Sequence, residues 1–274
     1  MIIYGWSDNG CRWWNLFMSN RMFELNDYFI VTGVSGLLGR EHAKAIMACG
    51  GSVIGIDLNS DEAKKIFGND IIFYECNITK HEDVEKVKNE IYKSNLAVKG
   101  LVNNAAINPS MDKKSKSIDY FESFDMDSWN LELSVGLTGA VICTKIFGNL
   151  IKDNGGGSIV NVSSDLGIIA PDQRIYKNTK KPVSYSVIKH GIIGLTKYTS
   201  TYWSQENVRC NALIPGGVKD SQDQDFVNKL EKLIPMGRMA EKDDYHGALI
   251  FLLSDASSYM TGSSLVVDGG RTCW

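Results

Sequence analysis

The sequence predicts a single α/β domain, built on a parallel β-sheet of about seven strands with helices on both faces. Three observations lead to this prediction. Short β-rich runs alternate with helical segments, a glycine-rich turn joins the first strand to the first helix, and no linker, internal repeat or low-complexity tract divides the 274 residues. Strands that alternate with helices form parallel sheets that are covered on both faces.

The N-terminal segment, residues 1–21, differs from the rest of the chain. It carries Trp6, Trp13 and Trp14 but shows no helical or strand periodicity. It also lacks the basic start and long apolar core of a signal peptide. We therefore expect the folded domain to comprise residues 22–274, with the first 21 residues as a leader outside the fold.

The first strand is predicted at residues 28–32, and the glycine turn at residues 33–39 leads from it into a helix. This context is typical of a dinucleotide site, in which the backbone approaches the pyrophosphate at the helix start. A second strand, residues 52–57, ends in Asp57. A carboxylate there binds the ribose hydroxyls and would repel a 2′-phosphate by about 4 kcal/mol, which favours NAD over NADP. Alternatively, Asp57 only begins a turn.

The alternation continues along the rest of the chain. The first helix is expected at residues 40–48. Further strands are predicted at residues 71–75, 100–102, 157–163, 208–214 and 264–268, and further helices at residues 81–92, 128–150, 184–203, 222–233 and 243–254.

Tyr185 and Lys189 lie four residues apart on a predicted helix, so their Cβ atoms are about 5–6 Å apart on one face. Free tyrosine has a pKa near 10, but a cation about 4 Å away favours the phenolate by roughly 4 kcal/mol. Such a tyrosine could exchange protons near neutral pH. The alternative is an ordinary contact on the surface of an amphipathic helix.

The composition excludes several classes of protein. The net charge is −3 with no basic block, which disfavours nucleic acid and membrane surfaces as partners. The six cysteines form no Cys-x-x-Cys pair and indicate a reducing, cytoplasmic compartment. The four histidines show no metal-ligand spacing, and no apolar run approaches the roughly 18 residues of a membrane helix. We expect a cytoplasmic protein that acts on small molecules without a metal.

Seven short motifs occur in one order between residues 22 and 272, and together they resemble the short-chain dehydrogenase/reductase family. They are Thr32-Gly33…Gly39, Asp57, Asn103-Asn104-Ala105-Ala106, Ser163-Ser164, Tyr185-x-x-x-Lys189, Pro215-Gly216 and Val267-Asp268-Gly269-Gly270. The resemblance implies a Rossmann-like, doubly wound sheet with strand order 3-2-1-4-5-6-7, and a homodimer or homotetramer.

The resemblance also implies roles for particular residues. Ser164 would bind the substrate oxygen, Tyr185 would exchange a proton with it, and Lys189 would hold the nicotinamide ribose and lower the tyrosine pKa. Taken alone, Ser164 could instead be a capping or turn serine. The implied cofactor-binding residues are Gly33, Ser35, Gly36, Leu38, Gly39, Asp57, Leu58, Asn77, Ile78, Asn104, Tyr185, Lys189, Pro215 and Val218.

The chain departs from the family pattern at three places. Leu37 occupies a usual glycine position in the turn, and Gly136 stands where the family has an asparagine of a proton relay. Ser164 and Tyr185 are 21 positions apart, and the extra segment is basic. Its Arg174 and Lys177 could hold a phosphate or carboxylate of the substrate, or belong to a solvated loop.

The inserted segment and the chain's end resemble oxidoreductases of bacterial surface-glycan and nonulosonic-acid pathways. We therefore predict an NAD-dependent oxidoreductase that interconverts a secondary alcohol and a ketone on an activated or acidic sugar, either anionic or nucleotide-linked. Two alternatives stay open. One is a general short-chain reductase for an aldonate or acyl ketone, and the other is a non-catalytic dinucleotide-binding sensor.

Overall fold

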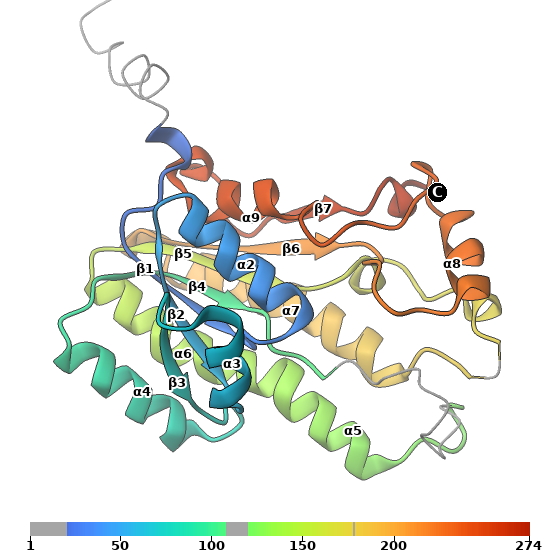
Figure 1. Cartoon of the computed structure of the whole chain (residues 1–274), viewed down its shortest axis with the longest axis horizontal. Helices are drawn as coiled ribbons and strands as arrows, with labels where there is room; N and C mark the ends of the chain where they lie inside the picture. Colours follow the sequence, from blue (N-terminus) through green and yellow to red (C-terminus); the bar gives the residue numbers. More distant parts are fainter. Residues whose placement is uncertain (1–20, 108–119, 178) are drawn as a thin grey trace, which may run out of the picture.

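The computed structural model describes residues 21–107, 120–177 and 179–274 of the chain. Their strands form one seven-stranded parallel sheet in the order β3-β2-β1-β4-β5-β6-β7 (Figure 1). This confirms the fold class and the strand order that the family resemblance implies. The strands are β1 Tyr28–Thr32, β2 Ser52–Asp57, β3 Ile72–Glu75, β4 Val98–Asn103, β5 Gly157–Val162, β6 Val208–Pro215 and β7 Ser264–Val267.

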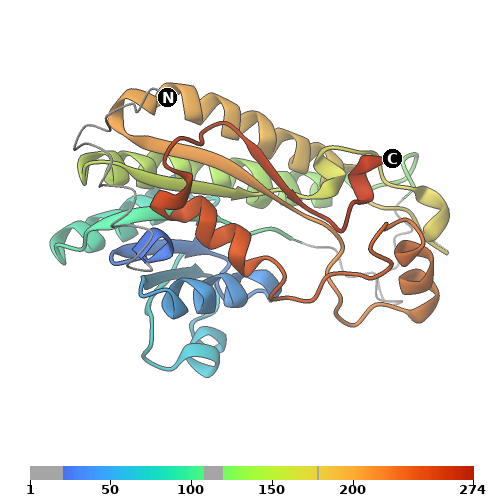
Figure 2. The same ribbon diagram turned by 90° about the horizontal axis from the view of Figure 1, so that it is seen from above.

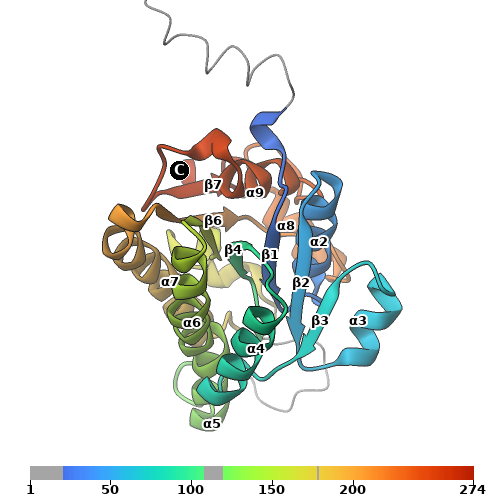
Figure 3. The ribbon, with the colours of Figure 1, turned by 90° about the vertical axis from the view of Figure 1, so that its left-hand side faces the viewer.

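Helices cover both faces of the sheet, with α4, α6 and α7 on one face and α2, α3 and α9 on the other (Figure 3). The longer helices are α2 Leu37–Ala48, α4 His81–Lys93, α6 Gly139–Asp153 and α7 Val183–Tyr202. The shorter ones are α3 Ser60–Phe67, α5 Met126–Leu133, α8 Gln224–Glu231 and α9 His246–Leu253.

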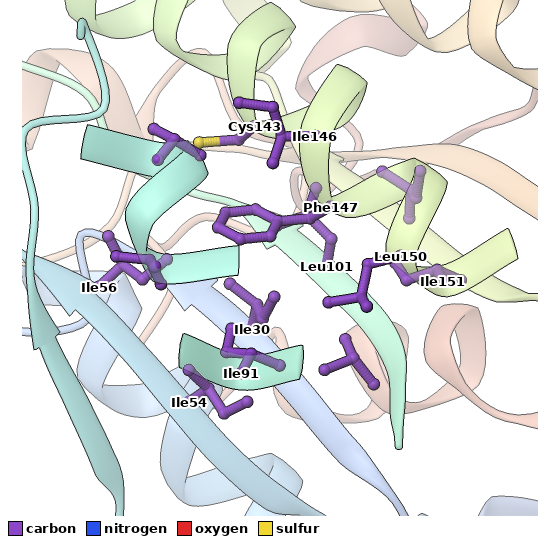
Figure 4. Close-up of a cluster of buried hydrophobic side chains, with 14 of the residues drawn as sticks. Ile30, Ile54, Ile56, Ile91, Leu101, Cys143, Ile146, Phe147, Leu150 and Ile151 are labelled. Carbon is purple, nitrogen blue, oxygen red and sulfur yellow. The ribbon is translucent and has the colours of Figure 1, made fainter. Parts of the chain in front are cut away.

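The core under α4 and α6 is centred on Phe147, which is fully buried against aliphatic side chains of the sheet (Figure 4). Ile30 and Leu101 come from the central strands β1 and β4, and Ile91 from α4. Burial of each such side chain contributes roughly 1.5–3 kcal/mol. This packing holds the strands rigid. The carboxyl ends of these strands carry the polar residues of the site.

The helix α3, Ser60–Phe67, lies between β2 and β3 and was not predicted from the sequence. Its signal is nevertheless present, because the Asn59 side chain accepts hydrogen bonds from the backbone N–H groups of Asp61 and Glu62. Asparagine is a preferred N-cap residue, and acidic residues in the first turn are stabilising there.

The predicted helix 128–150 is interrupted. The structure has α5 and α6 joined by a π-helical turn, Ser134–Thr138, around the buried Gly136. The whole run, Met126–Asp153, is long and apolar enough to pass a membrane-helix test, so the expectation that no run approaches that length needs correction. Its most apolar window is 56% buried inside the protein, and Cys143 and Phe147 of α6 lie in the core, as in a core helix.

The predicted leader lies outside the described residues except for Arg21, which begins a short 3-10 turn at Arg21–Phe23. The domain boundary expected at Met22 stays a prediction. Leu25 is buried, and its backbone N–H donates to the Cys49 carbonyl at 2.8 Å.

Candidate active site

The carboxyl ends of β1, β2, β4, β5 and β6 border a cavity of about 840 Å³. It lies at the point where the strand order reverses, between β1 and β4, which is where doubly wound sheets bind ligands. All but one of the predicted cofactor residues line it, the exception being Gly39. These residues are Gly33, Ser35, Gly36, Leu38, Asp57, Leu58, Asn77, Ile78, Asn104, Tyr185, Lys189, Pro215 and Val218.

The glycine turn between β1 and α2 is packed too closely for side chains. Gly33 has φ 64°, and a Cβ there would lie 2.8 Å from Ala105 Cα. A Cβ at Gly39 would lie 2.0 Å from the Gly33 carbonyl oxygen, so Gly39 allows α2 to pack onto the turn. The Asn104 amide donates to the carbonyls of Thr32 and Gly33 at 3.0 and 3.2 Å. Asn104 therefore holds the turn in shape.

Asp57 is fixed by two backbone hydrogen bonds. Its Oδ2 accepts from the Ser35 N–H at 2.9 Å, and its Oδ1 accepts from the Leu58 N–H at 2.8 Å. The buried Ser35 hydroxyl has no partner among the described residues, and a phosphate oxygen would satisfy such a group. These residues fit a dinucleotide, because the first N–H groups of α2 lack partners within the helix and Asp57 can accept from ribose hydroxyls.

The three predicted catalytic residues meet at the other end of the cavity. Ser164 follows β5, and Tyr185 and Lys189 lie one turn apart on α7. The Ser163 hydroxyl donates to the Lys189 carbonyl at 2.6 Å and ties α7 to the end of β5. The Lys189 ammonium donates to the Val162 carbonyl at 2.9 Å.

The pKa of Tyr185 differs from the sequence expectation. Burial raises the pKa of Tyr185, a hydrogen bond with Ser164 lowers it, and the nearby Asp165 raises it further. The Lys189 ammonium lies 5.7 Å from the tyrosine ring centroid. Burial, followed by the charge of Lys181, lowers the pKa of Lys189 to about 8. Lys189 is not among the causes of this shift, and the expectation that it lowers the tyrosine pKa stays a prediction.

A buried ion pair lies next to Ser164 and was not predicted from the sequence. The Ser164 hydroxyl donates to Asp165 Oδ1 at 2.7 Å, and Arg271 Nη1 donates to Asp165 Oδ2 at 2.6 Å. All three side chains are almost fully buried. Asp165 and Arg271 are 106 positions apart, so no local spacing could have paired them.

The basic segment contributes a different cation from the two that were predicted. Arg174 is 88% exposed and forms a two-point ion pair with Asp172, and Lys177 is exposed. Neither lines the cavity, so the structure does not bring these two predicted substrate residues to the site. Lys181 does line it, with its ammonium 3.7 Å from the Tyr185 ring centroid. Figure 2 shows the segment around η5 (Gln173–Ile175) together with α8 and the C-terminal turn, at the end of the molecule where the C-terminus is marked.

Comparison with known proteins identifies the chain's family. Residues 33–272 match a family model described as enoyl-(acyl carrier protein) reductase. The chain belongs to the short-chain dehydrogenase/reductase family.

A flagellin modification protein of Campylobacter coli is 30% identical over 255 residues, which cover 89% of this chain and 98% of that protein. An NADP-dependent mannitol dehydrogenase of Hypocrea jecorina is 29% identical and covers 93% and 97% of the two chains. A short-chain dehydrogenase structure from Leptospira borgpetersenii with bound NAD+ is 28% identical, with TM-score 0.82 and coverage of 99% and 97%.

As a short-chain dehydrogenase/reductase, the chain is an NAD(P)-dependent enzyme. It oxidises a hydroxyl-bearing carbon to a carbonyl or catalyses the reverse reduction. Its relatives include dehydrogenases of polyols and of other alcohols. Relatives that use NAD and relatives that use NADP both occur, so family membership by itself leaves the choice of cofactor open.

The family departure at Gly136 now has a structural context. Gly136 is buried in the π-helical turn, and a Cβ there would lie 2.9 Å from Ile188 Cγ2 on α7. Isolated π turns inside helices are frequent at functional sites. The cavity is lined instead by the neighbouring Val135 and by Leu131. The glycine therefore lets this helix approach α7 closely and does not widen the cavity.

Proposed function

We propose that this enzyme prefers NAD and interconverts a secondary alcohol and a ketone on an acidic or activated sugar. One observation carries the proposal. A single cavity has the carboxylate of Asp57 at one end and the hydroxyls of Ser164 and Tyr185 at the other. A dinucleotide that lies between them would reach from the adenosine ribose to the reacting carbon.

The preference for NAD rests on the fixed position of Asp57. Both of its oxygens already accept backbone N–H groups, so the carboxylate cannot easily rotate away from the ribose. A 2′-phosphate at about 4 Å would meet a repulsion of roughly 4 kcal/mol per charge pair. NADP would therefore bind more weakly than NAD.

The proton chemistry belongs to the side chains around Tyr185. The cofactor supplies or accepts the hydride when it is bound. The Tyr185 hydroxyl exchanges the proton with the substrate oxygen. The Ser164 hydroxyl donates to Asp165, and its oxygen accepts from the Leu166 backbone N–H at 3.2 Å as the N-cap of the turn that follows. One lone pair of that oxygen remains to accept a hydrogen bond from a substrate hydroxyl or from Tyr185. Arg271 holds that aspartate in place.

A sugar-like substrate is supported by the names of the relatives and by the polar lining at this end. A mannitol dehydrogenase and a flagellin modification protein are among the relatives described above. The hydroxyl-bearing residues that line the substrate end are Ser164, Tyr176 and Tyr185. Hydroxyl groups of this kind suit a polyhydroxylated molecule.

The test is a substrate panel with NAD and with NADP, in which formation of the reduced cofactor is followed by absorbance. The panel comprises polyols, aldonates and nucleotide sugars. We expect turnover with at least one sugar class, a lower KM for NAD than for NADP, and loss of turnover in Tyr185→Phe. Equal KM values for the two cofactors would contradict the proposed preference.

We also propose that the enzyme is a homodimer or homotetramer. Aromatic side chains on the outer face of α7 support this proposal, since Tyr198 and Tyr202 are 67% and 63% exposed and stack on each other. Light scattering during size-exclusion chromatography would give the mass, and a monomer would contradict the proposal.

A further inference from the structure

Three cations line the cavity beside Tyr185, and two of them already have oxygen partners. Lys189 donates to a backbone carbonyl, and Arg271 is paired with Asp165. Lys181 differs. Its ammonium lies over the tyrosine ring, and no oxygen of the described residues accepts a hydrogen bond from it. An ammonium has three N–H donors, and those that do not point at the ring are available to a molecule in the cavity.

The position of Lys181 is built into the local backbone. The Gln173 side chain accepts a hydrogen bond from the Lys181 backbone N–H at 3.0 Å. Pro182 follows as the N-cap of α7, with φ −55°, and its ring restricts the backbone there. The chain therefore enters α7 in one direction and carries the lysine side chain to the cavity wall.

The surroundings of Lys181 favour one extra negative charge. Burial lowers the pKa of Lys181 to about 8, whereas Asp165 and Glu132 raise it. Both carboxylates are already engaged, because Asp165 binds Arg271 and Glu132 accepts a hydrogen bond from Ser184. A charged group that is removed from water without hydrogen bonds is costly, so a substrate anion would stabilise this ammonium.

We propose that Lys181 binds a carboxylate of the substrate, placed within a few bonds of the carbon that is oxidised or reduced. The carboxylate must lie this close to the reacting carbon because the Lys181 ammonium lies over the ring of Tyr185, whose hydroxyl exchanges the proton. A single ammonium between two carboxylates matches a singly charged carboxylate better than a phosphate dianion. The inference rests on the proposed function and narrows its substrate class to sugar acids and related hydroxy acids.

A different role for Lys181 would be to tune Tyr185 without touching the substrate. A cation over the face of an aromatic ring is attracted to it, and such a cation could change the acidity of the phenol. That role would alter the rate and the pH profile equally for charged and neutral substrates. The carboxylate role changes affinity for the charged substrate alone.

The experiment compares hydroxy carboxylates with polyols of the same carbon skeleton. Calorimetry measures binding of D-gluconate against D-glucitol, and of threonate against threitol, to the full chain saturated with NADH, which cannot oxidise an alcohol. We expect wild type to prefer the carboxylate of at least one pair by tenfold to a hundredfold, which corresponds to about 1.4–2.8 kcal/mol. Lys181→Met should abolish that preference and leave polyol affinity nearly unchanged. Lys181→Arg should retain it.

The matched control is Lys177→Met, which removes an exposed lysine from the same segment and should keep the preference. The proposal is overturned if wild type prefers the carboxylate in neither pair, or if the preference survives in Lys181→Met. Failure of the proposed function would look different. No alcohol in the panel would then form reduced cofactor, whatever the anion preference in binding.

A pH series separates the Lys181 ammonium from the other groups that face it. With its pKa lowered to about 8, the ammonium is charged below that pH, so the carboxylate preference should fall as pH rises through about 8. In Lys181→Arg the guanidinium stays charged, and the preference should persist. If the carboxylate preference falls with rising pH in both wild type and Lys181→Arg, a neighbouring group titrates in place of Lys181. That result would overturn this part of the proposal. These neighbours are Tyr185 and Lys189 from α7, Asp165 from the turn after β5, and Glu132 from α5.

Discussion

The contact between Gly136 and Ile188 is narrow enough to give a quantitative prediction. In Gly136→Ala the new Cβ would lie 2.9 Å from Ile188 Cγ2 and 3.3 Å from its Cδ1, whereas carbon atoms pack best at about 3.5–4.0 Å. Ile188 is itself buried against Ala140 and Ile192 and has little room to move. Overpacking of this kind costs about 1–3 kcal/mol. The melting temperature should fall by roughly 2–4 °C per kcal/mol.

A double-mutant cycle with Ile188→Ala tests this reasoning by urea unfolding. Ile188→Ala alone should cost about 2–5 kcal/mol through the cavity it leaves. In the double variant the alanine at position 136 no longer meets a clash, so the two costs should not add, and the coupling should be about 1–3 kcal/mol. Gly194→Ala on α7 is the control, because a Cβ there meets nothing within 4 Å. It should be neutral or stabilising by up to about 1 kcal/mol. Additivity within about 0.5 kcal/mol would refute the clash.

The same position bears on catalysis. An asparagine at position 136 would begin from the same crowded Cβ, so Gly136→Asn should destabilise the protein and should not raise the rate. A rate increase of more than tenfold would instead mean that the side chain supplies about 1.4 kcal/mol of transition-state stabilisation that the glycine lacks.

The remaining predictions concern the cavity and its buried ion pair. Tyr185→Phe should lower turnover by roughly 10²–10⁴ while NAD binding, measured by fluorescence titration, is retained; wild-type turnover would place the proton exchange elsewhere. Asp57→Ala should raise the affinity for NADP relative to NAD in paired titrations, and an unchanged ratio would show that the carboxylate does not face the ribose. Arg271→Met leaves Asp165 buried without its cation and should lower the free energy of unfolding by about 3–5 kcal/mol in urea titrations. Adding Asp165→Asn should recover part of that loss, and a fully stable single variant would rule out a desolvated pair.

The fold could be predicted because its signals are local. Alternating strands and helices, with a glycine turn after the first strand, are sufficient for a parallel sheet, and the strand order followed from the family resemblance. The interruption at Gly136 could not be placed in the same way. Its π turn lies where Gly136 comes close to Ile188 of α7, a residue 52 positions further along the chain.

The site was predictable where a function requires a fixed spacing along one element. Tyr185 and Lys189 share a helix, and Asp57 ends a strand, so the sequence placed all three at the cavity. The basic segment was harder to interpret, because composition treats its cations alike. In the structure Asp172 neutralises Arg174, whereas the backbone at Lys181 is held so that its ammonium reaches the tyrosine.

The ion pair between Asp165 and Arg271 also determines at what stage of chain synthesis the surroundings of Ser164 can be completed. A chain is synthesised from its N-terminus, and its earlier parts can begin to fold first. The strand that leads to Ser164 is therefore made long before the arginine that neutralises the neighbouring carboxylate. A nascent chain that has not yet reached Arg271 would have to bury Asp165 uncompensated, which is strongly unfavourable. The strands β1 and β2, with Asp57, are thus made early, whereas Ser164 acquires its final surroundings only after the residues beyond β7 have been added.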